Sequence, residues 1–217
     1  MFIEKKLIEI LSLIQRYIVK YQKQIRWLFY LSFIFLVLVF AISTKFSEFR
    51  PLWNDLGEKA ASISLISFWL TLIPGILKRL QISKIFVPIR TILMIFRKEI
   101  GISTYVLALL HYGWSRILPI LAIKGDLLSF NLFEVFGLIS FILMTPLFLT
   151  SNNWSMHNLG KTWKKLHKLS YFIVWVLFLH VIIREIDIKA VITLFIASLE
   201  IVSLIKEKQK TNQQQSQ

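Results

Sequence analysis

The chemistry open to this chain rests on four histidines, because the chain contains no cysteine. The missing thiols exclude disulfides, iron–sulfur clusters and covalent haem attachment through a CxxCH motif, so a bound metal would need imidazole or oxygen ligands. His111 and His180 lie inside apolar runs, whereas His157 and His167 lie in a polar stretch between two such runs. An imidazole gains nothing from lipid and must find a partner, so ionisable residues inside a membrane are candidates for function.

The composition places the apolar runs in a membrane. Of the 217 residues, 56% are hydrophobic and the mean hydropathy is +0.64, whereas apolar residues make up about 45–50% of soluble domains. No small-residue cleavage site closes the first apolar run, so we expect this run to stay in the membrane. The net charge of +14 could serve a nucleic acid or a membrane surface, and the placement of the charges decides between them.

Helical periodicity and run length predict an all-α membrane protein. Residues 2–25 carry apolar side chains near helical spacing, which indicates an amphipathic helix on the membrane surface or, alternatively, a partner-docking helix. Six apolar runs then approach the roughly 17–25 residues that cross the hydrocarbon layer. They cover residues 27–42, 60–77, 101–122, 132–150, 169–183 and 188–205. We therefore divide the chain into an amphipathic cytoplasmic segment (1–26), a six-helix transmembrane bundle (27–205) and a disordered cytoplasmic tail (206–217).

Basic residues give the expected orientation. Nineteen of the 26 Lys and Arg residues fall in the N-terminal segment, in residues 78–98, in residues 161–168 and in the tail. The other seven fall on the opposite side of a six-span chain, and short cytoplasmic loops carry the excess of basic residues. The sequence therefore predicts a multi-pass protein with both termini in the cytoplasm. The same asymmetry accounts for the net charge, so we expect membrane lipid and no nucleic acid as a partner.

His111 and His180 are predicted to lie at one depth. His111 follows Gly101, at the start of the third run, by 10 residues, and His180 follows Leu169, at the start of the fifth, by 11. A helix rises about 1.5 Å per residue, so both imidazoles lie roughly 15–16 Å deep. Two imidazoles that face each other at one level can hold the iron of a b-type haem between helices of a bundle. The alternative is that each histidine is a hydrogen-bonded packing residue.

His167 indicates a second haem site nearer the cytoplasmic face. It precedes His180 by 13 residues, which is about 20 Å along a helix. Thirteen steps of about 100° leave the two side chains some 140° apart, so either the fifth helix is bulged or tilted, or two cofactors approach it from different directions. A solvated interfacial histidine is the alternative. We expect His157, in the segment SNNWSMHNLG, to be solvated, although it is the one spare imidazole that could complete a site with His167.

Basic residues at the ends of the predicted helices could bind the anionic groups of a cofactor. Four of them precede the third and fifth spans and could meet haem propionates or a flavin phosphate: Arg97, Lys98, Lys164 and Lys165. Arg116 could serve an outer haem in the same way. The alternative is that these side chains snorkel to the membrane surface. Glu134 and Glu200 lie near span ends, and we expect them to reach water rather than to relay protons.

The residues around His167 carry a resemblance to a known family. The motif L-G-K-x-W-x-x-L-H-x-x-x-Y, with a second histidine 13 residues after the first, is present as Leu159, Gly160, Lys161, Trp163, Leu166, His167, Tyr171 and His180. The start of the third span is similar to the family pattern R-R-x-x-G…H, here Arg97, Lys98, Gly101 and His111. From about Gly57 to Ile183 the chain resembles the MsrQ (YedZ) family, within the ferric reductase-like transmembrane group.

This resemblance implies a haem b protein of the bacterial inner membrane that holds one or two haems through His111, His167 and His180. Members of the family take electrons from the quinone pool or from a cytoplasmic flavin reductase, and some bind FMN. They pass the electrons to MsrP, a periplasmic molybdopterin enzyme that reduces oxidised methionine. Two features depart from the family: Lys98 stands where a second Arg is usual, and the basic N-terminal segment is longer.

We therefore expect an electron-transfer subunit of an oxidoreductase system, which leaves substrate chemistry to a partner. A stand-alone ferric (metal) reductase is the alternative. A third class is a structural or transport protein in which the histidines pack or conduct protons. The chain has no glycine-rich dinucleotide fingerprint, so we do not expect it to accept a hydride from NADPH unaided.

Overall fold

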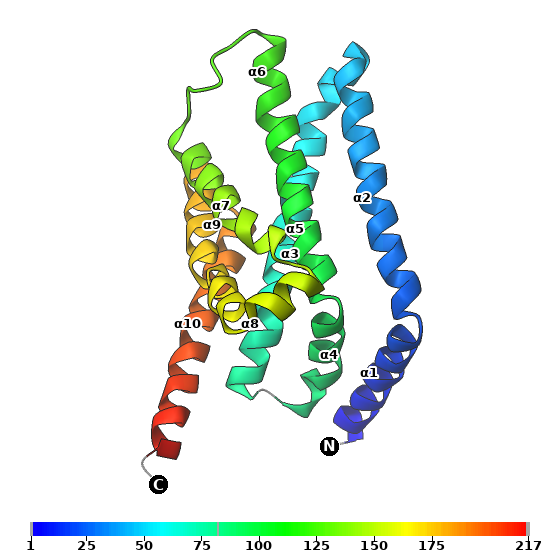
Figure 1. The fold of residues 1–217 in the computed structure, drawn as a ribbon, viewed down its shortest axis with the longest axis vertical. Coiled ribbons are helices and arrows are strands. Elements are labelled where there is room, and N and C mark those ends of the chain that lie inside the picture. Colours follow the sequence, from blue (N-terminus) through cyan, green and yellow to red (C-terminus); the bar gives the residue numbers. More distant parts are fainter. Residues whose placement is uncertain (1, 82, 216–217) are drawn as a thin grey trace.

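The structure, a computed structural model, describes residues 2–81 and 83–215, and these residues form helices and no strand (Figure 1). The α-helices of this part of the chain are α1 (Phe2–Lys20), α2 (Gln22–Lys45), α3 (Trp53–Leu80), α4 (Val87–Ile95), α5 (Arg97–Tyr112), α6 (Leu118–Ala122), α7 (Leu132–Leu149), α8 (Asn153–His167), α9 (Ser170–Arg184) and α10 (Ile188–Gln215). Shorter elements connect or extend them: the 3-10 helices η1 (Ser47–Leu52) and η2 (Lys84–Phe86) and the π-helix η3 (Gly113–Ile117).

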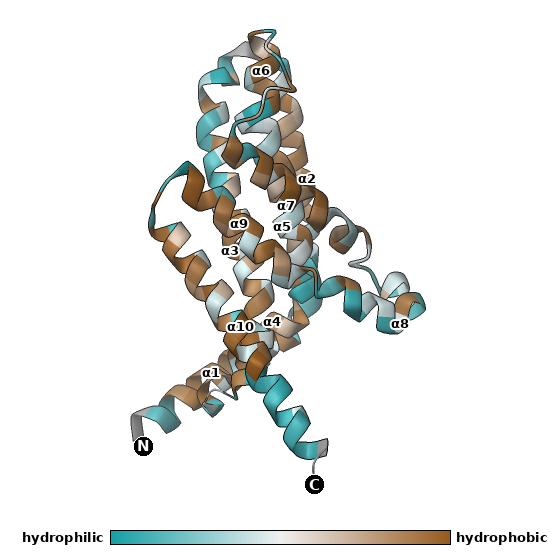
Figure 2. Cartoon of the chain, turned by 90° about the vertical axis from the view of Figure 1, so that its left-hand side faces the viewer, coloured by the Kyte–Doolittle hydropathy of each residue, from teal (hydrophilic) through white to brown (hydrophobic). Residues whose placement is uncertain are grey.

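The six predicted apolar runs are all helical. Five helices are long and apolar enough to cross a membrane, and a sixth span results if α8 and α9, which meet at 42°, are counted as one. Apolar residues are concentrated along these helices (Figure 2). The first helix and the last turns of α10 lie at the same end of the molecule (Figure 1). The predicted all-α membrane bundle is therefore confirmed.

The N-terminal amphipathic helix is α1. Tyr21 separates it from α2, and one of its faces packs against α4 and η2. Its outer side carries an exposed apolar stripe made of Leu7, Ile10, Ile14 and Tyr17. An apolar stripe flanked by lysines and arginine suits a helix that lies in the surface of a membrane.

Five helices form a closed ring. Helix α3 packs against α5 and α10, α7 packs against α5 and α9, and α9 packs against α10. The ring therefore holds α5 and α9 apart, with α7 between them on one side and α3 and α10 on the other. Ile173 and Val174 of α9 and Ala197 of α10 are fully buried in its core. In lipid, such packing stabilises a bundle mainly through van der Waals contacts, because lipid tails are as apolar as the side chains.

Helix α2 lies outside this ring and is held at its two ends. None of the residues of its most apolar window is buried. Near its last turn, the indole N–H groups of Trp53 and Trp114 donate to the carbonyl and the hydroxyl of Ser43, at 3.1 and 2.9 Å. Near its start, Arg26 donates to the carbonyl of Ile95 at 3.0 Å. Polar contacts thus hold the two ends of α2, and Leu36, Val39 and Phe40 pack against the core cluster that contains Trp114, while the outer apolar side of the helix is left for lipid.

A buried ion pair joins α3 to α10 and corrects the expectation for Glu200. Instead of reaching water, Glu200 is 1% exposed and accepts a 2.6 Å hydrogen bond from Arg79. Arg79 also donates to the hydroxyls of Ser203, at 2.8 Å, and Tyr171, at 3.2 Å. A buried charge is costly unless it is paired and hydrogen-bonded. The glutamate therefore turns into the bundle because an arginine on the neighbouring helix meets it there.

The structure adds helices where the sequence predicted loops or disorder. Helix α4 occupies part of the basic loop at 78–98, and α8 contains His157, which was predicted to lie in a loop. The chain is kinked within α8 at Gly160, whose φ of 46° is one that glycine adopts readily. Helix α10 continues through the tail to Gln215, where the sequence predicted disorder. The residues after Lys206 include many good helix formers and neither glycine nor proline.

We expect Glu200→Leu to destabilise the protein by about 3–5 kcal/mol, because it leaves the Arg79 guanidinium buried without its counter-charge. Chemical unfolding in detergent micelles measures this loss. The matched control is Asp55→Ala, which removes the partner of Lys59 in an exposed pair with side chains 57% and 68% exposed and should change stability by about 1 kcal/mol or less. Equal losses in the two variants would contradict a buried pair.

Candidate functional site

His111 of α5 is held by the backbone of α3. Its Nδ1 lies 3.0 Å from the carbonyl oxygen of Gly57 and 3.2 Å from the hydroxyl of Ser115. A carbonyl oxygen only accepts hydrogen bonds, so Nδ1 carries the proton and donates it to Gly57. The lone pair of the neutral ring is then on Nε2, as in a histidine prepared to bind a metal.

His180 of α9 is held in the same way from α7. Its Nδ1 lies 2.7 Å from the carbonyl oxygen of Phe133, which again assigns the proton to Nδ1 and the lone pair to Nε2. The ring lies against Gly137, one turn after Phe133, where an added Cβ would come within 2.8 Å of ring atoms. The imidazole of His180 can therefore take this position only because residue 137 is a glycine without a side chain.

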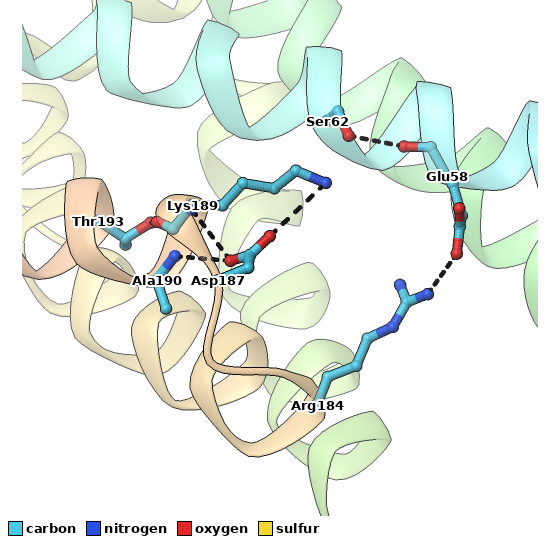
Figure 3. Close-up of polar contacts among 7 residues, drawn as sticks. All are labelled: Glu58, Ser62, Arg184, Asp187, Lys189, Ala190 and Thr193. Atoms are coloured by element: carbon cyan, nitrogen blue, oxygen red, sulfur yellow. Dashed lines mark hydrogen bonds and ion pairs between the residues drawn. The ribbon is translucent and has the colours of Figure 1, made fainter.

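Contacts between α3 and α9 relate the two histidines to each other. Gly57, which anchors His111, is followed by Glu58, and Glu58 accepts a 2.7 Å hydrogen bond from Arg184 (Figure 3). Arg184 lies one helical turn after His180. The anchor of one imidazole and the helix of the other thus meet at the same end of the ring. The two Nε2 lone pairs thus come from α5 and α9, which are not neighbours in the ring.

The two imidazole nitrogens of His111 and His180 would suit a metal whose other ligands come from a cofactor. Among the described residues, no three His, Cys, Asp or Glu side chains are grouped as a metal site. Two imidazoles fill two coordination positions, which is fewer than the four that protein-only metal sites commonly supply. The iron of a haem needs only axial ligands from the protein, because the porphyrin supplies the others. The Nε2 lone pairs of His111 and His180 are thus of the chemical type that could hold a haem iron.

A π-helical turn begins two residues after His111. In η3 the chain widens over Gly113–Ile117, and such turns inside α-helices are frequent at functional sites. Pro119 lacks the N–H that would bond to the carbonyl of Ser115 in a regular α-helix. An added Cβ on Gly113 would lie 2.5 Å from the ring of Phe40. Sequence reasoning missed this turn, although the proline was a signal for it.

His167 belongs to a separate cavity of about 390 Å³. Arg97 and Lys98 line the same cavity, whereas its lining includes neither His111 nor His180. The other lining residues include Phe68, Thr71, Tyr105, Met144, Phe148, Met156, Trp163 and Ser170. The volume lies in the range of small-molecule and cofactor sites. The structure therefore brings together three of the predicted residues in a cavity that is largely apolar and has two cations.

Thr150 and Trp163 fix the ring of His167. Its Nε2 lies 3.1 Å from the Thr150 hydroxyl, which is also 2.7 Å from the carbonyl oxygen of Pro146. Because Thr150 has one proton and the carbonyl accepts it, the contact with His167 is a bond donated by Nε2–H. The ring also stacks on Trp163, with centroids 4.1 Å apart. His167 thus has the tautomer opposite to that of His111 and His180, with the lone pair on Nδ1.

The remaining predicted residues lie elsewhere. His157 and Lys164 are exposed on α8 and do not line the cavity. Arg116 is buried and pairs with Glu134 at 2.6 Å, and the Glu134 side chain remains 20% exposed. Arg116 also donates to the carbonyl oxygens of Leu127 and Ser129. These contacts tie the α6–α7 loop to the bundle, and an outer-haem role for Arg116 stays a prediction.

Curated proteins indicate the family of this chain. It is 40% identical over 80 residues to the protein-methionine-sulfoxide reductase heme-binding subunit MsrQ of Brucella anthropi, an alignment that covers 35% of this chain and 36% of that protein. The MsrQ subunit of Brucella ovis is 35% identical over 106 residues, 45% of this chain and 48% of the relative. These relatives support the assignment of the chain to the MsrQ family. The chain thus spans less than half the length of the curated relatives it matches, and no protein-family model and no solved structure matches it.

The contact between Gly137 and His180 predicts a stability effect. Gly137→Ala should cost about 1–3 kcal/mol, because the new methyl group overlaps the imidazole. Gly101→Ala is the matched control, since an added Cβ there meets nothing within 4 Å. Chemical unfolding in detergent measures both. In the double variant Gly137→Ala/His180→Ala the clash is absent, so its stability should equal that of His180→Ala, and additive losses would contradict the contact.

Proposed function

We propose that this chain is a haem-binding membrane subunit that transfers electrons to a methionine sulfoxide reductase. The observation that carries the proposal is the pair of imidazoles on α5 and α9, each with Nδ1–H bound to a backbone carbonyl and Nε2 left as a lone-pair donor. The names of the MsrQ relatives agree with this chemistry. The proposal does not require the chain to be an enzyme on its own.

The residues of the chain would hold and tune the haem. His111 and His180 would hold the haem iron, and the b type is proposed because the chain has no cysteine for the covalent attachment of a c-type haem. When bound, the haem supplies one-electron exchange, which no side chain of this site supplies alone. The carbonyl oxygens of Gly57 and Phe133 orient the rings and raise the basicity of Nε2.

The cavity at His167 is the proposed entrance for electrons. Arg97 and Lys98 give it two cations suited to the propionates of a second haem or the phosphate of FMN. With Nε2–H bound to Thr150, His167 would bind an iron through Nδ1. It would bind through Nε2 only if the hydrogen bond to Thr150 were broken. The cavity lies near the start of α5, which follows α4, the helix against which α1 packs. With both termini in the cytoplasm of a bacterium, this end faces the electron donor, a quinol or a cytoplasmic flavin reductase.

Stacked aromatic rings connect the cavity to the other site. Tyr105 and Phe148 line the cavity and stack with centroids 4.3 Å apart. Tyr105 also stacks on Phe141 at 4.9 Å, and Phe141 lies 6.2 Å from Tyr112, the residue after His111. The planes differ by no more than 15° in each pair. We propose that electrons cross from the cavity to the His111–His180 level along this stack and leave on the periplasmic side toward an MsrP-like reductase.

Optical spectra of histidine variants test the proposal. The reduced wild-type protein, purified from cells supplied with haem, should show a haem b band. His111→Ala and His180→Ala should each abolish the same spectral component, because the two rings hold one iron. His167→Ala should leave that component in place and affect only a component bound in the cavity.

The control for these spectra is His157→Ala, which removes an exposed imidazole and should leave every band unchanged. Loss of different components in His111→Ala and His180→Ala would contradict the shared site. A wild-type protein that purifies colourless despite haem supply would contradict the function itself. Ferric ion reduction by the purified protein with a flavin reductase alone would favour a stand-alone metal reductase instead.

A further inference from the structure

Arg184 lies on the helix that carries His180 and contacts the helix that anchors His111. It is the last residue of α9 and follows His180 by four residues, so both side chains project from the same face of the helix. Its Nη2 reaches across to Glu58 of α3, 2.7 Å from Oε1 (Figure 3). Glu58 follows Gly57, the anchor of His111. The guanidinium therefore links α9, which carries His180, to α3, which anchors His111.

The partner of Arg184 can be exchanged at little cost. The side chains of Arg184 and Glu58 are 42% and 62% exposed, and ion pairs with this exposure contribute little to stability. Other cations at this end have partners of their own. Arg116 is buried with Glu134 and two backbone carbonyls, and Lys189 of α10 lies 4.0 Å from Asp187, which precedes that helix (Figure 3). Arg184 is thus a cation beside the site with a weakly held carboxylate.

We propose that Arg184 binds a propionate of the haem that His111 and His180 hold, and that Glu58 occupies the guanidinium only until the cofactor arrives. This inference rests on the proposed function. A guanidinium offers a planar fork of donors that matches a carboxylate, whichever molecule supplies it. Arg184 is a better candidate for this role than Arg116, because the Nη atoms of Arg116 are already bound to Glu134 and to two carbonyls of the α6–α7 loop.

The competing explanation is a clamp between α3 and α9, and the two explanations differ in what Glu58 does. If the pair is only a clamp, removal of either partner breaks it and both variants weaken the site equally. If Arg184 binds a propionate, Glu58→Gln frees the arginine and haem binding is retained, whereas Arg184→Gln loses the contact. The charge of the propionate supplies a second distinction, since esterification removes it without changing the porphyrin or the iron.

The experiment is a titration of the full-length apoprotein, in detergent, with haem and with haem dimethyl ester. The wild-type chain should bind haem about tenfold or more tightly than the diester, as expected for a charge-assisted bond. Arg184→Gln should lose this preference, and Glu58→Gln should keep it. Lys189→Gln, which removes a cation at the same end, is the matched control and should behave as the wild type.

Three results would overturn the inference, and they can be told apart. If Arg184→Gln keeps the full preference for haem over the diester, Arg184 does not bind a propionate. If Glu58→Gln and Arg184→Gln weaken haem binding in parallel, the pair is a helix clamp. If the wild-type chain binds neither porphyrin, the proposed function fails and the inference fails with it.

Discussion

The central constraint on this molecule is that an imidazole inside a membrane must satisfy its N–H group without water. His111 and His180 both do so with a backbone carbonyl of a neighbouring helix, Gly57 and Phe133 respectively. Each bond decides the tautomer of its ring and fixes its direction at once. The same hydrogen bond that makes the histidine tolerable in lipid therefore leaves Nε2 with its lone pair. Glycine at 137 belongs to this arrangement, because a side chain there would occupy the space of the His180 ring.

The rest of the fold places α7 on one side of α5 and α9 and places α3 and α10 on the other. A ring in which α5 and α9 are not neighbours leaves them apart, whereas direct packing would bring their side chains into contact with each other. Arg79 and Glu200 join α3 to α10, and Arg116 and Glu134 join the end of η3 to α7. These pairs connect consecutive members of the ring or their extensions. In lipid, where apolar burial alone does not drive helix association, such polar contacts have a larger share in choosing one arrangement.

The sequence predicted what depends on local pattern and failed where the outcome depends on a distant partner. Run length and hydropathy located the six apolar helices, and the apolar surroundings of His111 and His180 singled them out. Glu200 was expected to reach water because Arg79, its partner, lies on another helix and is 121 residues away in the chain. The tautomer of His167 could not be foreseen for the same reason, since it follows from Thr150. The π turn at Gly113 had a local signal in Pro119, but its position relative to His111 follows from packing against α2.

The most direct measurement of the central claim is electron paramagnetic resonance of the ferric protein carrying ¹⁵N at the Nε2 position of histidine. The variant to use is His157→Ala/His167→Ala, in which His111 and His180 are the two histidines that remain. The account predicts low-spin iron with hyperfine coupling to two ¹⁵N nuclei, one from each ring. Coupling to a single Nε2, or a high-spin signal from iron with one imidazole, would contradict it.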